Sequence, residues 1–120
     1  MRLTGSVPVL GCNDLDACLA FYQAALQFVI INKRQSDQGI EWVYLASGGC
    51  FLMLEKRAES DRDSRAPSRL YLYTDDVRQL HHYLQARGYA PGALSVTDYG
   101  MQEFDILDPE GHRLSIGEKA

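Results

Sequence analysis

The sequence repeats one pattern at two places that lie about half a chain length apart. Val7–Phe28 reads VPVLGCNDLDACLAFYQAALQF, and Arg69–Ala90 reads RLYLYTDDVRQLHHYLQARGYA. Each stretch runs from a short apolar strand through an acidic turn into an amphipathic helix, and Asp14 corresponds to Asp76, 62 positions later. Solenoids are built from three or more shorter repeats, so a duplication of this length instead predicts two similar modules in one domain. A binding site is then expected to draw residues from both modules.

The composition is that of an ordinary globular domain, with 46% hydrophobic and 23% charged residues among 120. No stretch is apolar enough to cross a membrane and no signal peptide precedes the first strand, so we expect a cytoplasmic protein without a membrane partner. Cys12, Cys18 and Cys50 lack the spacing of metal ligands and are interpreted as reduced thiols. The net charge of −4 argues against nucleic acid and leaves room for a cationic ligand.

Hydrophobic periodicity and turn residues predict one strand, one helix and three further strands in each module. A short polar side chain at a helix start satisfies free backbone N–H groups, so Asn13 or Asp14 caps the first helix and Asp75 or Asp76 the second. The expected strands are Val7–Leu10, Phe28–Ile31, Trp42–Leu45, Cys50–Glu55, Arg69–Tyr73, Leu94–Val96, Met101–Leu107 and Arg113–Gly117.

We interpret residues 1–120 as a single domain made of two modules joined by a charged linker. Module 1 covers about residues 1–56, and module 2 covers about residues 69–120. Between them, residues 57–68 read RAESDRDSRAPS, which is almost wholly charged or small and is predicted to be a mobile connection.

Alternation along each strand separates side chains that pack against a helix from side chains that oppose it. Phe104 is expected in the core with Ile106, whereas Trp42 and Tyr44 are assigned to neither face. The opposing face gathers aromatic and charged residues, which is typical of a ligand cleft or a subunit interface. The candidate ligand-binding residues are Phe51, Met53, Glu55, Arg69, Tyr71, Tyr73, Glu103, Asp105, Arg113 and Ser115.

These motifs resemble the vicinal oxygen chelate superfamily of glyoxalases, bleomycin-resistance proteins and extradiol dioxygenases. The resemblance lies in the strand, (N/D)D turn and LAFY helix, then GG-x-x-L-x-L, and then DPEGH-x-L near the end of the second module. Tyr99–Glu118, YGMQEFDILDPEGHRLSIGE, is most similar to the bleomycin-resistance branch. The resemblance implies an α+β fold of two tandem βαβββ modules, forming a curled eight-stranded mixed sheet with helices on the outer face. It also implies a homodimer in which one subunit completes the other's cleft.

Metalloenzymes of that superfamily hold a divalent ion with four side chains, and the resemblance places the matching positions at Val7, Met53, Arg69 and Ser115. Valine has no donor atom, arginine stays positively charged, methionine sulfur is soft, and a lone serine hydroxyl is a poor ligand. We therefore predict no metal, no cofactor and no catalytic residue. Glu55 shares a face with Met53 and is the one carboxylate that could turn toward such a site.

The sequence thus predicts a small-molecule binding protein of the glyoxalase/bleomycin-resistance family. It would sequester an amphipathic aromatic or cationic compound without a metal, as in antibiotic resistance. Arg69 is expected to bind an anionic group or to pair with Glu55. Two alternatives remain open: a metal-dependent glyoxalase-like lyase, and a non-catalytic interaction subunit whose cleft an Arg69–Glu55 pair would close. His81 and His82 are expected at the surface or half-buried, and His112 is interpreted as structural.

Overall fold

The computed structural model describes residues 1–62 and 66–120, and the chain divides into two compact units, Met1–Arg65 and Ala66–Ala120. Each unit contains one four-stranded mixed sheet and one α-helix, in the order strand, helix, three strands. The predicted α+β class and the two tandem βαβββ modules are therefore confirmed, with the eight strands hydrogen-bonded as two sheets. The predicted module boundaries and the single-domain interpretation stay predictions.

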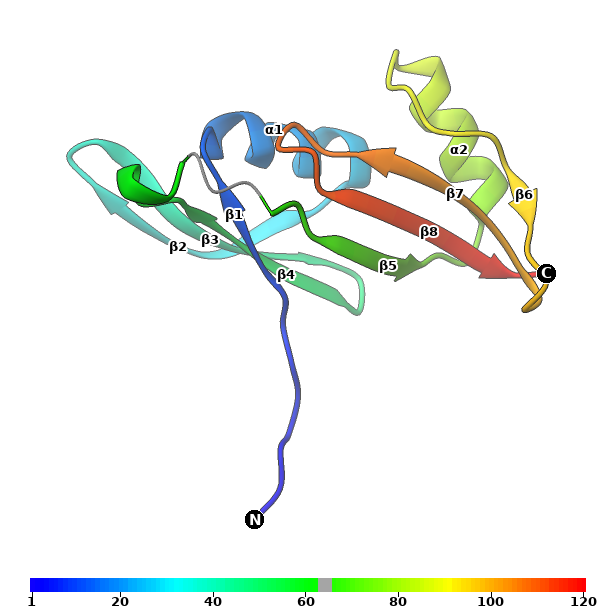
Figure 1. Cartoon of the computed structure of the whole chain (residues 1–120), viewed down its shortest axis with the longest axis horizontal. Coiled ribbons are helices and arrows are strands. Elements are labelled where there is room, and N and C mark those ends of the chain that lie inside the picture. The colour runs from blue at the N-terminus through cyan, green and yellow to red at the C-terminus, as the bar shows by residue number, and fades with distance from the viewer. Residues whose placement is uncertain (63–65) are drawn as a thin grey trace. The chain divides into compact units, whose positions relative to one another are not determined.

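The elements of unit 1 are β1 (Val9–Cys12), α1 (Leu15–Leu26), β2 (Val29–Ser36), β3 (Gly39–Ser47), β4 (Cys50–Lys56) and the short 3-10 helix η1 (Glu59–Asp61). The strand order is β1-β4-β3-β2, with β1 parallel to β4 and the other pairs antiparallel (Figure 1). A parallel pair needs a crossover connection, which α1 begins. This helix packs on β3 and β4, where Val43, Leu45, Leu52 and Leu54 are fully buried.

The elements of unit 2 are β5 (Arg69–Tyr73), α2 (Val77–Ala86), β6 (Ser95–Val96), β7 (Met101–Leu107) and β8 (Arg113–Lys119). Their order, β5-β8-β7-β6, repeats the plan of unit 1, with β5 parallel to β8 (Figure 1). The helix packs on β7 and β8. Phe104 and Ile106 of β7 and Leu114 and Ile116 of β8 are buried there, as alternation predicts. Among the described residues, no helix is long and apolar enough to cross a membrane.

The acidic residue that caps each helix is now defined. Asp14 Oδ1 accepts a hydrogen bond from the Ala17 N–H at 3.0 Å, and Asp76 Oδ1 accepts one from the Gln79 N–H at 3.0 Å. Each carboxylate thereby satisfies one of the free N–H groups of the first turn. Asn13, the other candidate in the first module, instead donates to the Arg62 carbonyl at 3.2 Å.

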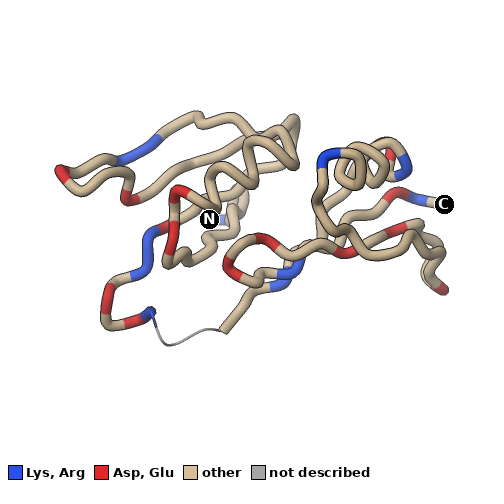
Figure 2. Tube along the Cα trace, turned by 90° about the horizontal axis from the view of Figure 1, so that it is seen from above, with Lys and Arg blue, Asp and Glu red and all other residues tan. Residues whose placement is uncertain are grey.

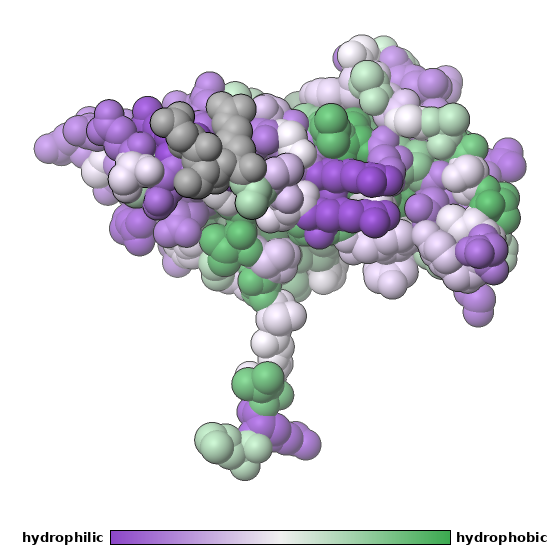
Figure 3. All heavy atoms as spheres, in the orientation of Figure 1, coloured by the Kyte–Doolittle hydropathy of each residue, from purple (hydrophilic) through white to green (hydrophobic). Residues whose placement is uncertain are grey.

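The first strand begins later than predicted. It covers Val9–Cys12 instead of Val7–Leu10, and residues 1–8 form no regular structure. Figure 3 shows the N-terminal segment standing clear of the rest of unit 1 with hydrophobic residues on it, and Met1 and Leu3 are fully exposed. The Pro8 carbonyl accepts a hydrogen bond from the Met53 N–H at 2.9 Å. Proline has no backbone N–H to donate, so the regular ladder with β4 begins after Pro8, at Val9.

The expectation that His81 lies at the surface or half-buried was wrong. The side chain is only 9% exposed, and its Nε2 lies 2.7 Å from the Gly92 carbonyl oxygen. Its ring meets the Phe104 ring edge-on, with centroids 5.0 Å apart. His81 lies four residues after Val77 and three before Leu84, so it falls on the buried stripe of α2. His82, one residue on, is exposed.

The predicted linker is partly ordered in its described portion. Figure 2 shows acidic and basic positions close together along the segment that follows β4, and this segment contains η1. The Arg57 N–H donates to the Cys12 carbonyl at 2.9 Å, which extends the pairing of β1 and β4 by one residue. The remaining linker positions 63–65 lie outside the described residues.

Candidate functional site

The face of the unit 2 sheet that opposes α2 carries all seven candidate residues of the second module. Strand register arranges them in three rows across β5, β8 and β7. The first row consists of Arg69, Arg113 and Leu107. The second consists of Tyr71, Ser115 and Asp105, and the third of Tyr73, Gly117 and Glu103. Because neighbouring strands lie about 5 Å apart, side chains within one row can touch each other.

A chain of hydrogen bonds joins the first two rows. The Arg69 guanidinium donates to Ser115 Oγ at 3.2 Å, and the Ser115 hydroxyl donates to Asp105 Oδ1 at 2.6 Å. The other Asp105 oxygen accepts two donors of the Arg113 guanidinium, with Nε at 2.8 Å. Ser115 is fully buried by these neighbours, so this face of the sheet is not simply solvated.

The network sets the protonation of Asp105. Partial burial acts to raise the pKa of this carboxyl, but hydrogen bonds from Ser115 and Arg113, together with the positive charges of Arg113 and Arg69, outweigh it and leave the pKa lowered. Asp105 is therefore held as a carboxylate, and it neutralises one of the two arginines that face each other across β5 and β8.

Two tyrosine hydroxyls converge on Glu103 in the third row. Tyr71 donates to Glu103 Oε1 at 2.9 Å, and Tyr99 donates to the same oxygen at 2.6 Å. Partial burial, followed by the hydrogen bond and the charge of Glu103, raises the pKa of Tyr71 to about 12. The bond to Glu103 is the main cause that raises the pKa of Tyr99. Both phenols therefore remain neutral donors at physiological pH.

The corresponding face of unit 1 is mainly aromatic. Register pairs Trp42 with Glu55 and Tyr44 with Met53, which places Trp42 and Tyr44 on the face that opposes α1. Ring centroids lie 6.3 Å apart for Trp42 and Tyr44, and 6.2 Å apart for Tyr44 and Phe51. The candidates Phe51, Met53 and Glu55 thus share one surface with Trp42 and Tyr44, which the sequence assigned to neither face.

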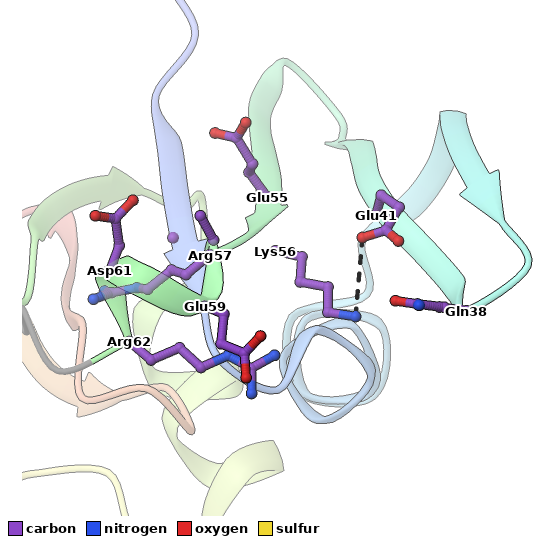
Figure 4. Close-up of a pocket in the computed structure, with 10 residues that line it drawn as sticks. Gln38, Glu41, Glu55, Lys56, Arg57, Glu59, Asp61 and Arg62 are labelled. Atoms are coloured by element: carbon purple, nitrogen blue, oxygen red, sulfur yellow. Dashed lines mark ion pairs between the residues drawn. The ribbon is translucent and has the colours of Figure 1, made fainter.

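A charged hollow of about 480 Å³ lies beside this aromatic surface within unit 1 (Figure 4). Lys56 Nζ and Glu41 Oε2 approach to 3.9 Å on one side of it. The Arg57 side chain lies against Gly11 in this hollow, so a β-carbon added at Gly11 would come within 2.8 Å of Arg57 Nε. The lining residues are Gly11, Gln38, Glu41, Glu55, Lys56, Arg57, Ala58, Glu59, Asp61 and Arg62.

Comparison with known proteins identifies the family. Residues 6–116 match the family described as the Glyoxalase/Bleomycin resistance protein/Dioxygenase superfamily. The chain belongs to this superfamily. The match confirms the resemblance that the repeated motifs indicate, while no curated protein sequence matches the chain significantly.

Solved structures of superfamily members and related proteins share the fold at low sequence identity. The antibiotic binding protein TnmS3 from Streptomyces sp. CB03234 has a TM-score of 0.80 at 22% identity, covering 100% of this chain and 99% of that one. A bleomycin-binding protein complexed with bleomycin has a TM-score of 0.77 at 20% identity, covering 98% and 100%. A lactoylglutathione lyase from Agrobacterium tumefaciens has a TM-score of 0.76 at 22% identity, covering 98% and 95%. One fold therefore hosts binding proteins and an enzyme, and residues must decide between them.

The four positions that hold the divalent ion in metalloenzymes of the superfamily do not fit a metal in this member. Val7 has no donor atom and precedes β1. Arg69 keeps its positive charge and donates to Ser115, so two of the four positions are bonded to each other. The remaining residue of the four, Met53, offers only a soft thioether. Within residues 1–62 and 66–120, no group of three His, Cys, Asp or Glu side chains is arranged to hold a metal ion.

Two residues of the unit 2 face are not among the ligand-binding residues that the sequence predicts. Tyr99 lies in the turn before β7. Alternation assigns side chains to a face only within a strand, so it does not place Tyr99. Gly117 lies on the predicted face but has no side chain, so a search for functional groups passes over it. A signal was present, because a glycine in the middle of a strand often marks a close approach of another group.

Proposed function

We propose that this superfamily member binds a small amphipathic compound, aromatic or cationic, without a metal ion, and that sequestering the compound confers antibiotic resistance. The observation that carries the proposal is the exposure of aromatic rings beside charged groups on the sheet faces that oppose the helices. Tyr73 of unit 2 is 78% exposed and Phe51 of unit 1 is 42% exposed. Exposed rings bordered by a few placed polar groups are typical of ligand-binding surfaces.

The fold comparisons support this proposal without deciding the ligand. TnmS3 is an antibiotic binding protein, and the bleomycin-binding protein is complexed with bleomycin. The residues that we propose to contact ligand are Phe51, Met53, Glu55, Arg69, Tyr71, Tyr73, Glu103, Asp105, Arg113 and Ser115.

Arg69 has hydrogen-bond donors that its contact with Ser115 does not use. In unit 2 it donates to Ser115, and no acidic side chain among residues 66–120 forms an ion pair with its guanidinium within 4.0 Å. Its remaining donors could bind an anionic group of the ligand. The predicted pairing of Arg69 with Glu55 would join the two units and stays a prediction.

A metal-dependent lyase is the second candidate, because a lactoylglutathione lyase shares the fold. The donor chemistry of Val7, Met53, Arg69 and Ser115 argues against it. We also propose a cytoplasmic homodimer, as the family resemblance implies. Light scattering that gives twice the chain mass would support the dimer, and a single chain mass would overturn it.

The experiment that tests the binding function is calorimetry with bleomycin and a panel of planar aromatic cations. Replacing Tyr71 by Ala should weaken binding by about 1–3 kcal/mol, since it removes a ring from the proposed surface. The matched control is Tyr83→Ala on α2, which lies away from this sheet face and should leave the affinity unchanged. Equal affinity of wild type and Tyr71→Ala would remove the unit 2 face from the site.

A further inference from the structure

Gly117 creates the space in which Tyr71 lies. It pairs with Tyr73 of β5 and Glu103 of β7, and it is buried. A β-carbon added at Gly117 would overlap the Tyr71 hydroxyl and come within 3.0 Å of Cζ and 3.2 Å of Met101 Cε. The φ angle of Gly117 is not positive, so the position does not require glycine for its backbone conformation. The missing side chain matters because the Tyr71 ring occupies its place.

With its ring over Gly117, Tyr71 approaches Glu103 while Tyr99 approaches from the turn before β7. Both hydroxyls donate to Oε1, at 2.9 Å and 2.6 Å. Within unit 2, no group among residues 66–120 donates to the second oxygen, Oε2. The two phenols therefore fix the orientation of the carboxylate and leave one oxygen as an acceptor for a bound molecule.

Aromatic rings border this acceptor. The rings of Tyr71 and Tyr73 have centroids 5.2 Å apart and are tilted by 55°. Tyr73 and Tyr99 are both largely exposed, so the surroundings are open to a ligand. A carboxylate oxygen bordered by aromatic faces favours a positively charged donor, because both the charge and the ring quadrupoles attract a cation.

Charge is distributed unevenly along the same face. The row of Arg69 and Arg113 lies two rows from Glu103, and Asp105 in the middle row neutralises only Arg113. The face therefore has a basic end and an acidic end, and a ligand with one cationic group would place that group at Glu103.

We propose that Tyr71, Tyr99 and Glu103 form a receptor for a protonated amine, whose N–H donates to Glu103 Oε2, and that Gly117 is the positioning residue that allows it. This inference rests on the proposed function, namely that this face binds a small compound, and specifies the chemical class. The amine is carried by an aromatic or apolar body that contacts the exposed tyrosine rings.

The test is a fluorescence titration of the intact chain with two probes that share one fluorophore. Dansylcadaverine carries an ammonium group, and dansylamide does not. Wild type should bind dansylcadaverine about tenfold or more tightly than dansylamide, as expected for a charge-assisted hydrogen bond. Glu103→Gln should remove this preference, and Gly117→Ala should reduce it. Equal affinities of wild type for the two probes, or a preference retained in Glu103→Gln, would overturn the receptor.

A second readout needs no ligand and tests the positioning role alone. Tyr71 titrates with a pKa of about 12, and Tyr71→Phe identifies its contribution to the phenolate absorbance. Gly117→Ala should move this titration toward the ordinary value of 10.0, because the β-carbon displaces the ring from Glu103. The variant should still fold, since the overlapping atom is at the end of a rotatable side chain. An unchanged Tyr71 titration would overturn the role of Gly117.

The two proposals fail in different ways. If neither dansyl probe binds but bleomycin or a planar cation does, the amine receptor is overturned and the binding function stands. If no compound of either panel binds while the Tyr71 titration moves as expected, the positioning of Tyr71 is supported and both the receptor and the binding function are overturned.

Discussion

The Ser68 backbone N–H donates to His112 Nδ1 at 2.8 Å, which ties the residue before β5 to the residue before β8. The Arg113 N–H donates to the Ser68 carbonyl at 2.9 Å, so the two chain segments are bonded twice. His112 is 1% exposed, so water has little access to take the place of Nδ1 as the acceptor for the Ser68 N–H. These bonds start the parallel pair on which Arg69 and Ser115 lie, in keeping with the structural role predicted for His112.

Replacing His112 by Leu should destabilise the protein by about 1–3 kcal/mol, because the Ser68 N–H loses its acceptor in a partly buried place. Urea unfolding measures this loss, and amide hydrogen exchange at Ser68 reports the bond itself. His112→Asn is the matched variant, since its side-chain oxygen can still accept. Slow exchange at Ser68 in the Leu variant would contradict the assigned bond.

Replacing Asp76 by Ala should cost about 1 kcal/mol of stability, because the Gln79 N–H loses its cap. Asp75→Ala removes the same charge one residue earlier and should change stability by less than about 0.5 kcal/mol. Chemical denaturation of the two variants makes the comparison. A larger effect at Asp75 would show that the cap has been assigned to the wrong residue.

Asp105 should stabilise the protein in a pH-dependent manner. Its pKa in the folded state is lowered from the ordinary 3.8, so its contribution is present above that value and is lost as the pH falls through the folded-state pKa. Asp105→Asn should therefore cost about 1 kcal/mol at neutral pH, a modest value because the ion pair with Arg113 is partly exposed. The difference from wild type should shrink below about pH 4.

The control for Asp105 is Asp98→Asn in the turn before β7, where the side chain is exposed. Urea unfolding from pH 7 down to pH 3 should show no comparable change in that variant. A cost for Asp105→Asn that stays constant over this range would rule out the carboxylate as its origin.

Tyr71 should make the protein sensitive to alkaline pH. The phenol of the unfolded chain loses its proton near the ordinary pKa of 10.0, whereas the folded chain keeps it to about 12. The unfolded state then binds fewer protons, so the stability due to Tyr71 is complete below about pH 10 and is lost as the pH rises to about 12. Unfolding free energies of Tyr71→Phe should fall less steeply over this interval, and parallel curves would contradict the shift.

Divalent ions should not stabilise the protein. A metal at 100 times its dissociation constant would add about 2.7 kcal/mol, or roughly 10 °C to the melting temperature of a domain near this size. Thermal melts of chelator-treated protein with Zn²⁺, Ni²⁺, Mn²⁺, Co²⁺ and Fe²⁺ should show no such increase. A clear increase with one ion would contradict the register assigned around Met53 and make lyase activity the next assay.

Much of the fold follows from local patterns. Strands β5 and β7 have the bounds that the sequence predicts, and the buried hydrophobic residues of β4 and β8 are those that alternation selects. In β8, Ser115 and Gly117 of the opposite face are buried as well. The face of Trp42 and Tyr44 could not be predicted, because it depends on how β3 is registered against β4. The prediction for His81 was wrong because it relied on the polar character of histidine. Its position on the apolar stripe of α2 decided its burial instead.

The sequence by itself determined the duplicated module, the type of each element and the face that carries aromatic and charged residues. These properties depend on neighbours two to four positions away, which periodicity reports directly. Only the tertiary structure decided which side chains bond. Tyr71 and Glu103 meet over Gly117 because the register of three strands brings them into adjoining rows, and register between distant segments is not contained in local periodicity.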